Sequence, residues 1–141
     1  MNTRMKAAFT GYLLALLLFT AFGFIYLFRS QFMPYHETAI GMPWADVPRG
    51  FQIIITALMH SYGGSMLAIA LAMVAMLVIP FRKGETWVKY VLPAVSLVYS
   101  IPALIVTLTV RASTPAEPPW IAVVAGIVLV IASFILSLTN K

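Results

Sequence analysis

Four long apolar segments, separated by short polar or proline-rich connections, dominate the hydrophobic pattern of the chain. They cover residues 9–28, 51–79, 87–110 and 120–139, and the one charged residue within them is Lys89, near a segment edge. Each has about the 20 apolar residues that a helix needs to cross a lipid bilayer. Backbone polar groups inside a bilayer must bond to one another, and no segment alternates like a barrel strand. We therefore predict four transmembrane helices.

This pattern predicts an all-α integral membrane protein, with one domain over residues 1–141 and four helices in an antiparallel up-down bundle. The composition agrees, because 62% of the residues are apolar and 9% are charged, whereas about a quarter are charged in soluble domains. A cleaved signal peptide is the alternative for the first segment, since Arg4 and Lys6 precede it. We reject that alternative because the apolar run is too long for a typical signal sequence.

Basic residues are distributed unevenly between the two predicted sides of the membrane. One side holds Arg4, Lys6, Arg82, Lys83, Lys89 and Lys141, and the other holds Arg29, Arg49 and Arg111. Because cytoplasmic loops are enriched in Lys and Arg, we expect both termini in the cytoplasm and the chain in a bacterial inner membrane. The net charge of +5 then suits contact with anionic membrane lipids. No basic stripe with interleaved aromatics indicates a nucleic-acid partner.

The connections differ in length and composition. The external loop 29–50 is the longest, and Pro34 in it predicts a short helical turn that ends at Gly41, because proline suits the start of a helix and glycine its end. Asp46 is expected to cap the second long helix, with Pro48 just inside it. The connection 81–89 is short, so the second and third long helices are expected to pack as neighbours, as are the third and fourth.

His60 is the one acidic, basic or histidine side chain placed deep in a predicted span. An ionisable residue in that position is a candidate functional residue. Counting from the external end of its segment at 1.5 Å per residue puts it about 13 Å deep, at the level of Thr20 and Pro102. Pro102 leaves a helical carbonyl without its usual donor, and the glycines beside His60 allow close approach of another group.

These residues predict a ligand pocket in the outer half of the bundle. Its expected members are Thr20, His60, Tyr62, Gly63, Gly64, Tyr99, Ser100 and Pro102, and the expected external lid consists of Tyr35, His36, Glu37 and Trp44. The structural alternative is that His60 only joins neighbouring helices through a hydrogen bond. Both interpretations stay open at this point.

Few residue patterns indicate chemistry beyond binding. The chain has no cysteine and lacks hydrolase, zinc-protease and phosphate-loop motifs, so we predict no catalytic residue, no metal site, no cofactor and no enzymatic activity. Haem on His60 is an alternative, and so is Cu(I) on the evenly spaced Met59, Met66 and Met73. We interpret the methionines as packing residues.

One face of the second long segment carries small residues at helical spacing: Ala57, Ser61, Gly64, Ala68 and Ala72. Such faces let membrane helices approach closely, so this face predicts association with a protein partner or with a second copy of the chain. We therefore expect a non-enzymatic accessory or scaffold subunit of a larger membrane complex. The alternatives are a binding protein for a lipid, quinone or other apolar ligand near His60, and a haem-carrying redox subunit.

Overall fold

The computed structural model describes residues 1–138, and within that range the chain forms helices and connecting turns without a strand. The four long helices are α1 (Thr3–Phe28), α3 (Arg49–Met76), α4 (Thr86–Ser113) and α5 (Trp120–Leu138). The short helix α2 (Pro34–Ile40) and the 3-10 turn η1 (Trp44–Asp46) lie between α1 and α3. The end of the last predicted span, at Thr139, lies outside the described residues, as does Lys141.

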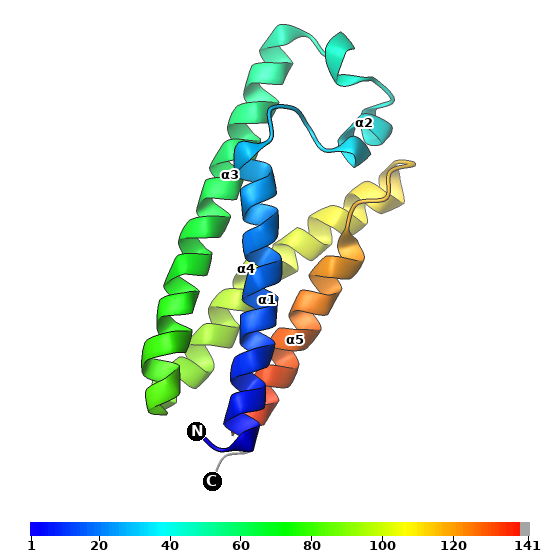
Figure 1. Ribbon diagram of the computed structural model, residues 1–141. Coiled ribbons are helices and arrows are strands. Elements are labelled where there is room, and N and C mark those ends of the chain that lie inside the picture. The colour runs from blue at the N-terminus through cyan, green and yellow to red at the C-terminus, as the bar shows by residue number, and fades with distance from the viewer. Residues whose placement is uncertain (139–141) are drawn as a thin grey trace.

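All four long helices are long and apolar enough to cross a membrane, which confirms the prediction of an all-helical chain with four long apolar segments. Figure 1 shows that α1 and α4 run from one end of the molecule to the other and that α3 and α5 run back. Helix α1 begins six residues before its predicted span, because the Asn2 side chain accepts a hydrogen bond from the Met5 backbone N–H at 3.0 Å and caps the helix.

Helix α3 continues through a proline. A π-helical turn, η2 (Leu77–Phe81), contains Pro80 and follows α3 directly. Pro80 has no N–H to donate, and its ring would clash with a carbonyl of a regular α-helix. Single π-helical turns of this kind interrupt α-helices without ending them. Together, α3 and η2 cover 33 residues, so α3 extends beyond the end of α1 (Figure 1).

The loop between α1 and α3 matches the sequence prediction in part. Helix α2 begins at Pro34 and ends at Gly41, which has a positive φ of 65°, as predicted. The prediction that Asp46 caps the next helix was wrong, because α3 begins at Arg49 with Pro48 in the capping position. Asp46 instead closes η1, where its backbone N–H donates to the Pro43 carbonyl at 3.0 Å.

Helix α1 packs closely against both α3 and α5. At the contact with α3, a Cβ atom added to Gly63 would lie 2.5 Å from the Leu27 backbone nitrogen and 2.8 Å from the Gly23 carbonyl oxygen. At the contact with α5, a Cβ atom added to Gly126 would lie 2.9 Å from the Phe19 ring. Glycines therefore set the spacing of α1 from both neighbours, as in many membrane helix pairs.

The backbones of α3 and α4 come close where η2 meets α4 and diverge toward the outer end, where α2 lies (Figure 1). The expectation that these helices are neighbours therefore holds near their connection, and side chains such as Tyr62 and Tyr99 join them farther out. Between α1 and α4, the rings of Phe19 and Tyr99 meet edge to face at 5.7 Å, so large side chains fill the space between these two helices. Helix α4 packs against α5, as predicted for that pair.

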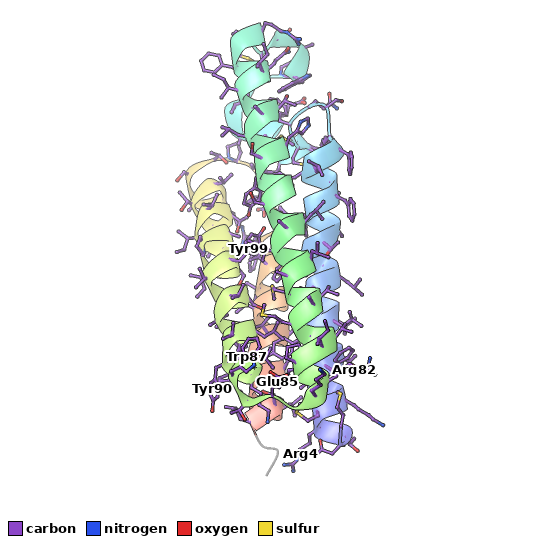
Figure 2. The ribbon with its side chains drawn as sticks, turned by 90° about the vertical axis from the view of Figure 1, so that its left-hand side faces the viewer. Arg4, Arg82, Glu85, Trp87, Tyr90 and Tyr99 are labelled. Atoms are coloured by element: carbon purple, nitrogen blue, oxygen red, sulfur yellow. The ribbon has the colours of Figure 1, made fainter. Side chains whose placement is uncertain are left out.

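Basic residues outnumber acidic ones at the end of the molecule that contains the N-terminus. Arg4, Arg82 and Glu85 lie there, whereas Tyr99 lies farther toward the other end (Figure 2). The core beside this charged end is well packed, since Tyr12, Leu77, Phe81, Val88 and Leu92 are buried together. The inner half of the bundle is therefore closed, and the outer half is where the helices separate.

The two adjacent glycines of α3 allow a matched test of this packing. Gly63→Ala is expected to destabilise the fold by about 1–3 kcal/mol, because its Cβ would meet backbone atoms that cannot move aside. Gly64→Ala is the control, since a Cβ there meets nothing within 4 Å and alanine favours the helix. Thermal unfolding in detergent measures both, and equal melting temperatures for the two variants would contradict the α1–α3 contact.

Candidate functional site

A cavity of about 560 Å³ lies between the outer halves of the helices, within the range of about 300–1,000 Å³ found for small-molecule sites. Helix α1 contributes Leu18, Phe19, Phe22 and Tyr26 to its wall, and α3 contributes Leu58, Met59, Tyr62 and Met66. Helix α4 contributes Val98, Tyr99, Pro102, Ala103, Val106, Thr107 and Val110. The cavity therefore occupies the space that opens where α4 leaves α3.

Two further segments complete the wall. Tyr35 and His36 come from α2, and Pro118, Pro119, Ala122 and Val123 come from the α4–α5 connection and the start of α5. On the open side, the lining residues Leu58 of α3 and Val98 of α4 are 65% and 76% exposed. The cavity thus opens sideways between α3 and α4, past apolar side chains.

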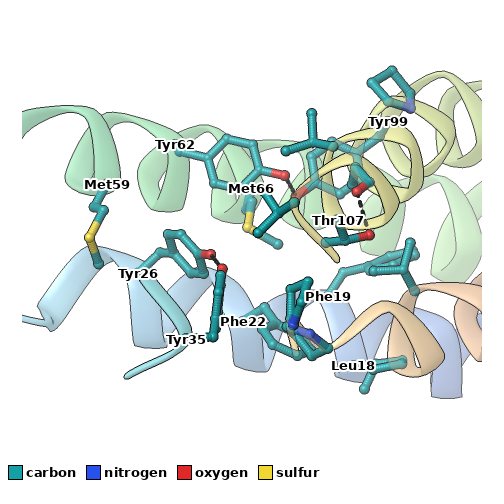
Figure 3. Close-up of a pocket in the computed structure, with 18 of the residues that line it drawn as sticks. Leu18, Phe19, Phe22, Tyr26, Tyr35, Met59, Tyr62, Met66, Tyr99 and Thr107 are labelled. Carbon is teal, nitrogen blue, oxygen red and sulfur yellow. Dashed lines mark hydrogen bonds between the residues drawn. The ribbon is translucent and has the colours of Figure 1, made fainter. Parts of the chain in front are cut away.

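Two pairs of tyrosines bring hydroxyl groups into this apolar space (Figure 3). The hydroxyls of Tyr26 and Tyr35 bond to each other, and the Tyr99 hydroxyl donates to that of Tyr62 at 3.1 Å. The rings of Tyr26 and Tyr62 meet edge to face at 5.5 Å, so the two pairs form one cluster. Each pair uses one of its two hydroxyl hydrogens, which leaves one donor in each pair without a partner within it.

His36 of α2 is held in a defined tautomer. Its Nδ1 accepts the Met33 backbone N–H at 3.3 Å, so the neutral ring carries its hydrogen on Nε2. The ring packs edge to face against Tyr35 at 4.3 Å and Phe32 at 6.2 Å. Burial, and then the charge of Arg29, lower the pKa of His36 from its ordinary 6.5. His36 therefore faces the cavity as a neutral hydrogen-bond donor.

The remaining polar groups of the wall are few. The Thr107 hydroxyl donates to the carbonyls of its own helix, at 3.0 Å from both Ala103 and Leu104, and Pro102 leaves the Val98 carbonyl without a helical donor. Burial and the hydrogen bond with Tyr26 raise the pKa of Tyr35, so its hydroxyl stays protonated. No charged side chain is among the lining residues. The site is suited to binding a neutral, mostly apolar molecule.

The structure brings some of the sequence-predicted pocket residues together and leaves others outside. Tyr62, Tyr99 and Pro102 line the cavity, and so do Tyr35 and His36 of the expected lid. The residues that do not line it are Thr20, His60, Gly63, Gly64 and Ser100 of the expected pocket, and Glu37 and Trp44 of the expected lid. Glu37 is exposed, and Trp44 packs on Phe32 with their ring centres 4.8 Å apart.

His60 lies beside the end of α1, where its Nε2–H donates to the Arg29 carbonyl at 3.0 Å. That carbonyl belongs to the residue that ends α1 and would otherwise have no helical donor. Counting placed His60 level with Thr20, because it assumed that the two helices start at the same surface. Helix α3 instead extends beyond α1, so Gly63 meets α1 at Gly23 and Leu27, and His60 lies one turn farther out.

Sequence reasoning missed most of the apolar wall. On α1, Phe19, Phe22 and Tyr26 recur at spacings of three and four residues and face the cavity. On α3, Met59 and Met66 line the cavity and are buried. The aromatic spacing on the first helix was the available signal, but an apolar stripe of this kind is also what a packed helix pair requires.

The small-residue face of α3 is separate from both the cavity and the contact with α1. Ala57, Ser61, Ala68 and Ala72 are exposed, and nothing lies within 4 Å of a Cβ atom added to Gly64. The buried face of α3 consists instead of Met59, Gly63, Met66, Ala70 and Met73. In residues 1–138, no three His, Asp or Glu side chains gather as metal ligands would.

The position of His36 predicts that acid destabilises α2. The pKa of His36 in the folded protein lies below its ordinary value of 6.5. As the pH falls through 6.5, the unfolded chain therefore binds more protons than the folded protein does. The contribution of His36 to the free energy of unfolding is thus complete above pH 6.5 and is lost as the pH falls toward the folded pKa. Protonated His36 also cannot accept the Met33 N–H. Histidine NMR titration measures the pKa, and His36→Gln is expected to reduce the change in melting temperature between about pH 7 and pH 5. A His36 pKa at or above 6.5 would contradict the arrangement.

No protein-family model, curated protein or solved structure matches this chain. A function is therefore inferred from the cavity and the residues around it.

Proposed function

We propose that the chain is a multi-pass membrane protein that binds an apolar molecule, taken from the surrounding lipid, in the cavity between α1, α3 and α4. The observation that carries the proposal is the shape of the site: about 560 Å³ of mostly apolar space that opens sideways between α3 and α4. With the four helices across a bilayer, this opening faces the hydrocarbon region, and α2 covers the end that faces water. A ligand dissolved in the membrane then has a direct path into the site.

The length and hydropathy of the four helices support the membrane location. Large apolar side chains on the outside of every long helix support it as well, such as Leu17 on α1, Leu71 on α3, Ile105 on α4 and Ile121 on α5. In water these side chains would be a large exposed apolar surface, whereas lipid tails solvate them. The basic end of the molecule then faces the cytoplasm, with both chain ends there and α2 on the opposite side.

Cysteine labelling tests this orientation cleanly, because the chain contains no cysteine of its own. Thr38→Cys on α2 is expected to react with a membrane-impermeant thiol reagent added to intact cells, since both this residue and Glu85 are exposed on the protein surface. Glu85→Cys is expected to react only after the cells are permeabilised, which is the control for its reactivity. The reverse pattern would overturn the orientation and place the α2 side of the cavity in the cytoplasm.

Filling the cavity tests the binding function. Ala103 lines the wall on α4, so Ala103→Trp is expected to displace the ligand. Ala125→Trp is the matched control, because Ala125 is exposed on α5 and does not line the cavity. Native mass spectrometry after mild-detergent extraction should show a retained small molecule in the wild type and in the control, and not in Ala103→Trp. Equal retention in all three proteins would contradict the site.

The exposed small-residue face of α3 favours a second candidate, an accessory or scaffold subunit of a larger membrane assembly. Exposed small residues allow a helix of another protein to approach closely. Faces of this kind also pack helices of one chain together. The same mass spectra test it. A protein partner or second copy that is retained by the wild type and lost in Ala68→Trp supports this candidate, whereas a partner-free monomer contradicts it. Ala68 does not line the cavity, so the two functions are tested independently.

A further inference from the structure

The polar groups of the cavity decide which membrane molecules it would select. Inside a bilayer, burying apolar surface gives little selectivity, because lipid tails are as apolar as the protein wall. Hydrogen bonds in such a setting are strong, and unpaired polar groups are costly. If the proposed binding function holds, the identity of the ligand therefore depends on the few hydrogen-bonding groups that line the cavity.

Three of those groups still have a hydrogen to donate, and the tyrosine oxygens can accept as well. The Tyr26–Tyr35 pair and the Tyr62–Tyr99 pair each keep one hydroxyl hydrogen that their mutual bond does not use, and His36 presents Nε2–H because its Nδ1 is occupied by the Met33 N–H. The wall also has one backbone acceptor, the Val98 carbonyl at the exposed rim of the cavity, because Pro102 has no N–H to donate to it. A ligand that satisfies this set must bring acceptor oxygens.

The cavity wall offers no counter-charge for an ionic headgroup. No Lys, Arg, Asp or Glu side chain lines the cavity. Arg29 acts on His36 through its charge, but it lies outside the lining and donates its Nε–H to the Phe32 carbonyl at 3.2 Å. An anionic or cationic group placed among these tyrosines would have no counter-charge in the wall, which is costly in an apolar site. The acceptor oxygens must therefore belong to a neutral group.

Aromatic rings line the cavity near the donors. The rings of Tyr62 and Tyr99 lie close to parallel, with 21° between their planes and 6.3 Å between their centres, and Phe19 and Phe22 contribute further rings to the same cavity. Aromatic faces pack well against another planar ring. We infer that the ligand is a neutral, lipid-soluble molecule with a planar carbonyl-bearing ring, of the quinone or aryl-ketone class, whose oxygens accept from the tyrosine pairs and His36.

Three synthetic probes test this inference, and each has a six-membered ring with a decyl chain. The probe 2-decyl-1,4-benzoquinone has neutral acceptor oxygens, decylbenzene has none, and 4-decylbenzoate has a charged carboxylate. The experiment titrates each probe into the purified full-length protein in one detergent and measures binding by native mass spectrometry. The double variant Tyr62→Phe/Tyr99→Phe removes both hydroxyls of one pair and keeps both rings, because a single substitution would leave the partner hydroxyl free to donate. Tyr90→Phe is the control, since Tyr90 is exposed outside the cavity.

The double variant is expected to bind the quinone about 2- to 10-fold more weakly, as the loss of a hydrogen bond predicts, with decylbenzene affinity unchanged. Micelle partitioning is the same for all variants, so it cancels in this comparison. Binding of decylbenzene also shows that the variant is folded.

If the quinone and decylbenzene both bind but the double variant weakens the binding of neither, or of both equally, the ligand class is wrong and the binding function stands. If 4-decylbenzoate binds the wild type more tightly than the quinone, the neutral headgroup is wrong. If no probe binds, the proposed function itself fails.

Discussion

The close approach of α1 and α3 at Gly23 and Gly63 determines the rest of the structure. A Cβ atom at Gly63 would lie 2.5 Å from the Leu27 nitrogen, so this register of the two helices depends on the missing side chain of Gly63. That register puts His60 beside the Arg29 carbonyl at the end of α1 and the Tyr62 ring beside Tyr26. Helix α4 makes no such backbone contact with α1, where the rings of Phe19 and Tyr99 meet instead, and the cavity lies in the space that opens between them.

Because of this register, some polar side chains stabilise the fold and others line the cavity. His60 completes the hydrogen bonding at the end of α1, so its imidazole is used by the fold. The hydroxyl of Tyr26, which also belongs to α1, bonds instead to the hydroxyl of Tyr35 of α2. Because the His36 Nδ1 accepts a backbone N–H at the start of α2, the short helix and the donor cluster of the cavity are held by the same few side chains. The loop that covers the cavity is thus also part of its binding surface.

The sequence was sufficient for the long helices, because length and hydropathy act locally along the chain. It also predicted α2 from Pro34 and Gly41, whose backbone preferences are local too. The relative height of two helices is different, since it depends on which residues meet across their interface. Counting from equal starting points placed His60 with Thr20, whereas glycine packing places it with Arg29. Tyr62, Tyr99 and Pro102 line the cavity because α3 and α4 diverge, and sequence periodicity carries no information about that divergence.

The most direct measurement is a crystal structure of the protein grown from a lipid mesophase, where membrane molecules are available to the site. The cavity is expected to contain a continuous, elongated density that no protein atom explains, with its polar end within hydrogen-bond distance of Tyr62 or Tyr35 and with α3 and α4 still apart at their outer ends. The contradicting result is a structure in which α4 packs along α3 and side chains fill the space between them. In that case the protein would have no binding cavity.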